Sequence, residues 1–421
     1  MDNKGLFLYG RENISFWDKL CAFVLVTAPL LQHYKGLVEN AGFTVLLLLT
    51  PVMFVKTGES INKKLFNKKC FYALFPLLFF NVYTIIIRDF NVMRFGYVLL
   101  MCWVFVCIAN GSFNLSLCFK YATKIAIVAS VAIIVQYISH YLLGKTIDFR
   151  PLSLLVSQNV IWVRTAVIYG AAGYIYRPSG FFLEPSHFFL YSFPVISVLL
   201  LSERKTKKHI QTALFLSLGL LLSTSGMGIA VVAGLWALYF FIYRKVDENN
   251  DVKVVELLNV GNIFIMLFVA VFFYCAYRFI PFFQHSVDRI FTEDNSNAID
   301  GRVRLVKMYV QSITGRAVWT GTPIGELDDL NFNVPGLFAT YIKWGVVGVV
   351  LSYWFYIRGL FVLKGPYFWF SVIIIIISYF TAHTHGTFYM LYFLLFFMNG
   401  YYERSRKKIL VNQKLVIAGV E

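Results

Sequence analysis

Two residues that could do chemistry, an arginine and a glutamate, stand seven positions apart in a short polar segment between very apolar runs. The segment reads Arg177-Pro-Ser-Gly-Phe-Phe-Leu-Glu-Pro-Ser-His187. Arginine carries a planar, permanently charged fork that suits phosphate and carboxylate groups. A carboxylate opposite a hydroxyl can act as a general base. We therefore predict that Arg177 and Glu184 are catalytic residues of a site that faces an aqueous compartment.

The residues within and after this pair predict how it is positioned. Pro178-Ser-Gly180 favours a turn, and Pro185 suits the first turn of a following helix. Glu184 would then stand at the helix N-terminus, where the dipole favours a carboxylate. A helix-terminal acid without chemistry is the alternative interpretation. His187 is more typical of a packing residue than of a second base, and we count it among the substrate-binding candidates.

Further arginines that could bind an anion lie in two long loops. Asp300 to Ser312 predicts an amphipathic helix, with Asp300 as its N-cap. Arg302 would lie in the first turn, where free backbone N–H groups also attract anions, and we predict it as the third catalytic residue. A plain surface helix is an equally open interpretation. The remaining substrate-binding candidates are Arg164, Arg304 and Arg316.

The composition places these residues in a membrane protein. Of 421 residues, 58% are hydrophobic and only 14% are charged, with a mean hydropathy of +0.67; soluble domains are about half apolar and about a quarter charged. Apolar runs that could cross a bilayer as helices recur along the chain, so we predict an all-α polytopic membrane protein with about 12 transmembrane helices. They lie near 17–32, 41–55, 71–87, 95–110, 123–143, 186–202, 210–224, 227–243, 259–280, 338–357, 367–382 and 387–401.

Basic residues predict the orientation of these helices, because Lys and Arg gather on the cytoplasmic side. Both termini and alternate loops hold 24 of the 38 basic residues. They include Lys56, Lys120, Lys124 and Arg204, which we assign to cytoplasmic loops, and the basic residues of 402–421, which we interpret as a cytoplasmic basic tail. Residues 144–185 and 281–337 then form two large periplasmic loops that contain short helices. The whole chain, 1–421, is expected to be a single integral membrane domain.

The predicted outer side is rich in arginine, which suggests an anionic ligand. Ten of its 14 basic residues are Arg, against six of 24 on the inner side. A lipid-linked diphosphate would fit, while snorkelling against phospholipid headgroups is the alternative interpretation. The net charge of +16 reflects this topology and attraction to anionic lipid, and nucleic acid is not expected as a partner. The ten arginines are residues 88, 94, 150, 164, 177, 278, 289, 302, 304 and 316.

Several motifs resemble one bacterial enzyme family. Arg177 to His187 resembles the R-P-x-G-x-F-x-E-P segment of O-antigen and capsular polysaccharide polymerases of the Wzy type. Gly301-Arg302, Gly321 to Gly325 and Asn331 to Gly348 resemble the outer-loop-to-span region of the wider O-antigen polymerase and ligase superfamily. Ser223-Thr-Ser-Gly226 is similar to a polar break that these proteins carry between two spans.

The resemblance implies a metal-independent, C-type glycosyltransferase of the bacterial inner membrane, without a cofactor. It would transfer a growing glycan from undecaprenyl diphosphate to a sugar hydroxyl on the next lipid-linked repeat unit. Arg177 and Arg302 would be the paired loop arginines of the family, and Glu184 the acid of its E-P motif. The implied partners are the undecaprenyl-diphosphate-linked oligosaccharide, the lipid bilayer and a chain-length regulator.

Other functions stay open at this point. The ligase branch of the family carries a histidine in the loop before the span at Gly345, but Asp328 to Pro335 contains none, which favours a polymerase. A lipid-linked oligosaccharide flippase would need polar groups along its spans, whereas the predicted spans are nearly free of charge. A non-enzymatic transporter or sensor of an anionic envelope ligand is the remaining alternative.

Overall fold

The computed structural model is mainly helical over the residues it describes, and these contain no strand, only isolated bridge residues such as the pair Tyr34 and Leu155. The structure describes residues 14–37, 40–62, 92–110, 112–156, 176–202, 205–243, 313–322, 335–380 and 388–401, with scattered residues in 75–82, 271–284 and 306–311. The helices are α1 (Phe16–Leu31), α2 (Ala41–Asn62), α4 (Val92–Ala109), α5 (Leu115–Tyr141), α7 (Pro185–Leu201), α8 (Lys207–Leu222), α9 (Gly226–Leu238), α13 (Ala317–Thr320), α14 (Gly336–Val362) and α15 (Pro366–Phe380). A further helix covers Phe388–Tyr401.

Three of these helices are long and apolar enough to cross a membrane: α2, α5 and α14. The shorter apolar helices α4, α7, α9 and α15 and the helix at 388–401 also coincide with predicted runs. The runs near 71–87 and 259–280 lie mostly outside the described residues, and a total of about twelve spans stays a prediction. The tail at 402–421 and most of the second predicted outer loop, including 285–305 and 323–334, also lie outside them.

The start of α5 corrects one predicted boundary. The helix begins at Leu115, eight residues before the predicted span. Lys120 and Lys124, which we assigned to a cytoplasmic loop, therefore lie within the helix. The error arose because these two lysines mark the polar end of the apolar run, and lysine is itself a good helix former.

The chain divides into two compact units. The first unit contains Met1–Gln32, Gly36–Ala122 and Leu305–Glu421. In it, α1 packs on α2, and Lys56 of α2 lies 3.2 Å from Asp18 of α1, with only 10% and 3% of these side chains exposed. Lys56 was predicted to be a cytoplasmic loop residue, but it is a buried partner in an ion pair between two helices. Removing either partner of such a pair would leave an uncompensated buried charge, which is strongly destabilising.

The helix α14 in the first unit is broken at Gly345, which has φ 63° and ψ −163°. The segment Trp319 to Thr322 crosses the break so closely that a methyl group on Gly345 would overlap the Trp319 carbonyl. The Thr322 N–H and hydroxyl both donate to the Ile342 carbonyl, at 2.9 and 3.0 Å. Backbone contact with this segment therefore holds the break. The Ile342 carbonyl, which precedes the break, receives its hydrogen bonds from Thr322 outside the helix.

Alanine at Gly345 is expected to lower stability by about 1–3 kcal/mol, because it meets both a left-handed backbone and an occupied space. The melting temperature of the purified protein in detergent measures the effect. The matched control is Gly58→Ala in α2, where an added methyl group meets nothing within 4 Å; it is expected to be neutral or slightly stabilising. Equal melting temperatures for the two variants would contradict the close crossing at Gly345.

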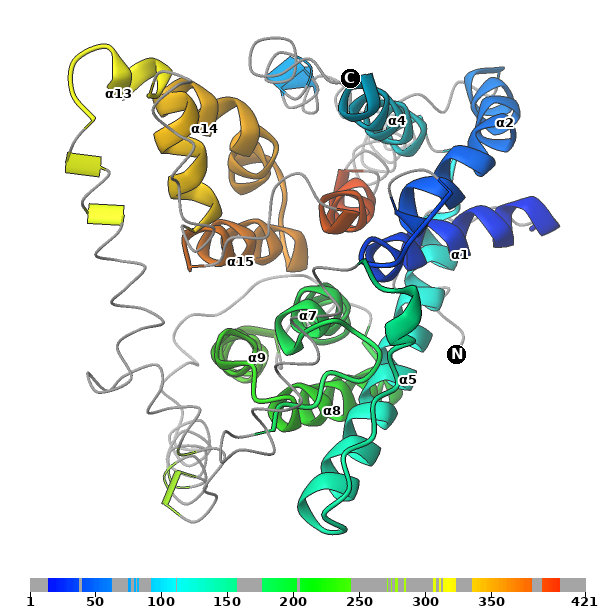
Figure 1. Cartoon of the computed structure of the whole chain (residues 1–421), viewed down its shortest axis with the longest axis vertical. Helices are drawn as coiled ribbons and strands as arrows, with labels where there is room; N and C mark the ends of the chain where they lie inside the picture. Colours follow the sequence, from blue (N-terminus) through cyan, green and yellow to red (C-terminus); the bar gives the residue numbers. More distant parts are fainter. Residues whose placement is uncertain are drawn as a thin grey trace, which may run out of the picture. The chain divides into compact units, whose positions relative to one another are not determined.

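The second unit contains His33–Lys35 and Thr123–Arg304. Its helices α7, α8 and α9 lie side by side in Figure 1, in green, and each packs on the other two. Every residue of α7 except Ser186 is buried. Gly219 of α8 allows close contact with Ser130 of α5, because a side chain at 219 would collide with the serine. Small residues at such contacts are typical of helices packed within membranes.

Candidate active site

The segment between Arg177 and Glu184 forms a compact turn in the second unit. The Phe182 N–H donates to the Ser179 carbonyl at 3.1 Å, and Gly180 has φ 64°, a conformation that favours glycine. Pro185 is the first residue of α7, and Glu184 is its N-cap. The predicted turn, the helix start and the terminal position of Glu184 are all confirmed.

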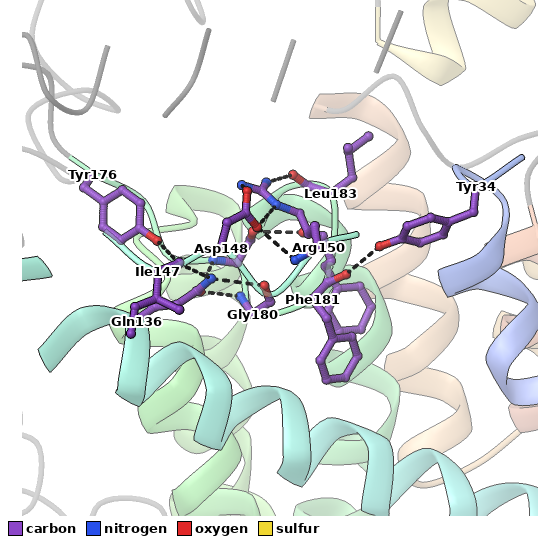
Figure 2. A network of polar contacts seen from close by, with 11 residues as sticks. Tyr34, Gln136, Ile147, Asp148, Arg150, Tyr176, Gly180, Phe181 and Leu183 are labelled. Carbon is purple, nitrogen blue, oxygen red and sulfur yellow. Dashed lines mark hydrogen bonds and ion pairs between the residues drawn. The ribbon is translucent and has the colours of Figure 1, made fainter. Parts of the chain in front are cut away.

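A buried glutamine that the sequence analysis did not single out holds this turn. The side-chain carbonyl of Gln136, in α5, accepts from the N–H groups of Ser179 and Gly180 at 3.2 and 2.7 Å. Its amide nitrogen donates to the carbonyls of Gly180 and Ile147, both at 3.2 Å. Figure 2 shows these contacts meeting at one side chain. The only signal in the sequence was a lone amide inside an apolar run.

One arginine of the first predicted outer loop has a structural role that the sequence analysis did not assign to it. Arg150 contacts both carboxylate oxygens of Asp148, at 2.7 and 2.8 Å, and donates to the Leu183 carbonyl at 2.8 Å. The two charged side chains are only 8% and 18% exposed. All three guanidinium nitrogens are therefore engaged, and Arg150 ties the loop after α5 to the chain just before Glu184 (Figure 2).

Arg177 lies on the polar break between α8 and α9. Its Nε donates to Thr224 Oγ1 and its Nη2 to the Thr224 carbonyl, both at 3.2 Å. The predicted break at 223–226 is confirmed, because α8 ends at Leu222 and α9 begins at Gly226 with Ser225 as its N-cap. Two motifs that are 47 residues apart in the sequence therefore meet through one guanidinium group.

Thr224 stores backbone strain at this contact. Its φ of 55° makes it the single non-glycine residue with a positive φ among those the structure describes. A β-branched residue is a true outlier there. Such strain costs about 1–3 kcal/mol and persists where surrounding contacts determine the conformation. Outliers of this kind gather at functional sites, so the strain supports a role for the break next to Arg177.

Glu184 and His187 occupy the first turn of α7, in different surroundings. The half-buried Glu184 accepts a hydrogen bond from the Ser186 hydroxyl at 2.9 Å and does not cap the helix with its side chain. His187 is 4% exposed and stacks on His33, with ring centroids 4.6 Å apart and planes 13° apart. This placement agrees with the interpretation of His187 as a packing residue and gives no support to its role as a substrate-binding residue.

Two tyrosines complete the surroundings of the turn. The Tyr141 hydroxyl donates to the Tyr176 carbonyl at 2.9 Å, and the Tyr176 hydroxyl donates to the Ile147 carbonyl at 3.4 Å. Burial raises the pKa of Tyr176 to about 12, opposed in part by the nearby Arg150 charge. Tyr176 therefore stays protonated at neutral pH and remains a hydrogen-bond donor that holds the loop.

The other predicted site residues are distributed as follows. Arg164, Arg302 and Arg304 lie outside the described residues. Arg316 belongs to the first unit, where it is exposed and is the N-cap of α13. Within the part of the chain that the structure describes, no three His, Cys, Asp or Glu side chains lie close enough together to hold a metal ion.

The arrangement of Arg177, Thr224 and Glu184 suits a particular chemistry. A half-buried guanidinium group whose orientation is fixed can stabilise an anion. A carboxylate at the other end of the same turn can accept a proton. Glu184 is the N-cap of α7, and Arg177 bonds to Thr224, which directly precedes the N-cap of α9; helix N-termini favour negative charge nearby. No protein-family model matches the chain, and no curated protein matches it either.

Proposed function

We propose that the protein is a polysaccharide polymerase, which joins undecaprenyl-diphosphate-linked oligosaccharide repeat units on the outer face of a bacterial inner membrane. It would be a glycosyltransferase whose donor is a polyprenyl-diphosphate sugar. The helical, apolar character of the chain supports a membrane location. The residues of the R-P-x-G-x-F-x-E-P segment and their resemblance to Wzy-type polymerases supply the reaction class.

The observation that carries the proposal is the compact turn with Arg177 at one end and Glu184 at the other. The turn is held by Gln136, and Arg177 bonds to the strained Thr224. A surface loop that only connects two helices would not need a buried amide, a partly buried ion pair and a left-handed threonine around it. Strained conformations that surrounding contacts hold in place are typical of groups that act on a substrate.

The proposed reaction breaks one bond and forms one. The acceptor hydroxyl oxygen bonds to the anomeric carbon of the donor glycan, and the bond from that carbon to the phosphate oxygen breaks. Undecaprenyl diphosphate leaves with the electron pair and is already stable as an anion, so its departure needs charge stabilisation more than a proton. Arg177 would supply that stabilisation, and Glu184 would accept the proton of the acceptor hydroxyl.

Two further arginines complete the proposal. By the resemblance, Arg302 is the partner of Arg177 on the diphosphate, with Arg304 as a neighbour. Both lie outside the described residues, so their part rests on the sequence alone. Because each arginine would neutralise part of the diphosphate charge, loss of either should weaken the same step.

An assay with purified protein and lipid-linked repeat units tests the function. Ladders of polymer on one lipid carrier are expected. Transfer of glycan to a lipid A core would indicate a ligase instead, and movement of the lipid across the bilayer without new glycosidic bonds would indicate a flippase. Either of those results, or no reaction in a preparation that binds the donor, would overturn the polymerase assignment.

A further inference from the structure

The chain that carries Arg177 runs along α5 from its end toward its middle. Tyr176 is bonded to Tyr141, the last residue of α5. Three and four residues later, Ser179 and Gly180 are bonded to Gln136, five residues further from that end. A Cβ on Gly180 would lie 3.1 Å from the Ala129 carbonyl and 3.5 Å from Ile133. The contacts therefore step steadily down the helix.

The distance travelled along α5 is large. Ile133 and Ala129 precede Tyr141 by eight and twelve residues, which puts Gly180 roughly 12–18 Å along the helix from its end. The 27 residues of α5 give a length of about 40 Å, compared with roughly 30 Å for the hydrocarbon core of a bilayer. If α5 crosses centrally, the tip of the turn lies inside the hydrocarbon core.

The other face of α5 supports a lipid environment at this level. Exposed apolar side chains recur at helical spacing along it and continue to the first residue after its end: Val128, Val131, Val135, Ile138 and Leu142, each between 40% and 74% exposed. The stripe covers the same stretch of helix that Gly180 and Gln136 occupy on the protein side. At this depth, one face of α5 would contact lipid and the opposite face contacts the turn.

The polar break between α8 and α9 lies at a similar level. Gly219 of α8 contacts Ser130 of α5, and Arg177 bonds to Thr224 one turn further along. The 16 residues of α8 give a length of about 24 Å, which is shorter than the roughly 30 Å hydrocarbon core. The break and the turn therefore meet below the end of α5.

We propose that residues 177–183 form a re-entrant turn inside the membrane and that Gln136 is the positioning residue that holds it there. Backbone groups at membrane depth are tolerated only where protein or water satisfies them. Gln136 satisfies four: the N–H groups of Ser179 and Gly180 and the carbonyls of Gly180 and Ile147. A lone amide in an apolar span thereby replaces the hydrogen bonds that a helix would have supplied.

The position of the turn can be measured with a fluorophore. Single cysteines at Phe181, Val135 and Lys145, in a cysteine-free background, would be labelled with bimane and reconstituted into lipid. Nitroxide lipids labelled at the headgroup or along the acyl chain then report depth from the ratio of their quenching. We expect the label at 181 to match that at Val135 on the α5 stripe and to lie deeper than that at the exposed Lys145. Headgroup-level quenching at 181, equal to that at 145, would overturn the re-entrant turn.

Substitutions at Gln136 test its positioning role, which rests on the proposed function. Gln136→Met keeps the size but not the four hydrogen bonds, so we expect the label at 181 to move outward and kcat to fall about tenfold to hundredfold, with a smaller change in KM for the donor. Gln136→Glu keeps the two acceptor contacts and should recover part of both effects. Val135→Met, on the lipid face, is the control and should change neither.

The two ideas fail in different ways. An unchanged depth and an unchanged kcat in Gln136→Met would overturn the role of Gln136 in a protein that still makes polymer. If Gln136→Met does not fold, the inference then depends on the partial effects of Gln136→Glu, and wild-type values there would contradict it. A deep label at 181 in a protein that makes no polymer would keep the re-entrant turn and remove the proposed function.

Discussion

Replacing Glu184 with glutamine is expected to lower the rate of polymer formation by about two to four orders of magnitude, the contribution typical of a general base. Glutamine keeps the size of the side chain and can still accept a hydrogen bond from the Ser186 hydroxyl, which lies 2.9 Å from the carboxylate. It cannot take the acceptor proton. Donor binding should therefore be largely kept, and single-turnover assays with lipid-linked repeat units would separate binding from transfer.

The alternative for Glu184 gives a different result. If the Glu184 carboxylate only interacts with the dipole at the start of α7, the substitution should cost about 0.3–1 kcal/mol of stability and polymer should still form. Glu203→Gln, on the predicted inner side, is the matched control and should leave the ladders intact. Ladders of wild-type length and rate from Glu184→Gln would assign the base elsewhere. Asp328 and Asp329 would then be the next candidates, because His187 is buried against His33.

Local features of this chain could be predicted from its sequence because they depend on neighbours. The apolar runs that lie within the described residues form helices, since a long run without charge has few other ways to satisfy its backbone. Pro178-Ser-Gly180 formed the predicted turn, and Pro185 marked the start of α7. Glu184 reached the helix terminus because the proline next to it fixes where the helix begins.

Contacts between distant segments could not be predicted in the same way. The residues around Gln136, Arg150 and Thr224 do not indicate their hydrogen-bond partners, which lie 43, 33 and 47 positions away. The sequence marked Arg150 as one of ten similar arginines, although Asp148 stands two positions before it. A charged pair so close in sequence can face solvent or close a loop, and only tertiary packing decides between these outcomes.

The break in α14 illustrates the same limit. Trp344-Gly-Val-Val-Gly348 reads as continuous span, and glycine is common in membrane helices. The helix breaks at Gly345 because the backbone of Trp319 and Thr320 occupies the space that a side chain would need. Such a crossing depends on a segment about 25 residues earlier in the chain, and hydropathy carries no information about it.

Replacing Arg177 with lysine is expected to lower polymer formation by about 10²–10³-fold while the protein still accumulates in the membrane, because the developing charge loses a preorganised donor. Arg177 reaches Thr224 through Nε and Nη2 at once, both at 3.2 Å, and this pairing fixes the plane of the guanidinium group. A lysine ammonium is a point charge on a flexible stem, so it cannot keep that orientation and face a diphosphate together.

The variants that accompany Arg177→Lys decide what the loss means. Thr224→Ser keeps the hydroxyl that accepts from Nε and should stay close to the wild type, whereas Arg302→Lys should resemble Arg177→Lys if the two arginines share the diphosphate. Arg204→Lys, on the predicted inner side, changes the same residue type where no diphosphate is expected and should be silent. Ladder assays at matched protein amounts would compare all four. Normal polymer from both Arg177→Lys and Arg302→Lys would indicate that the two arginines are interfacial residues. Departure of a diphosphate that they bind should slow when the bidentate guanidinium groups are lost.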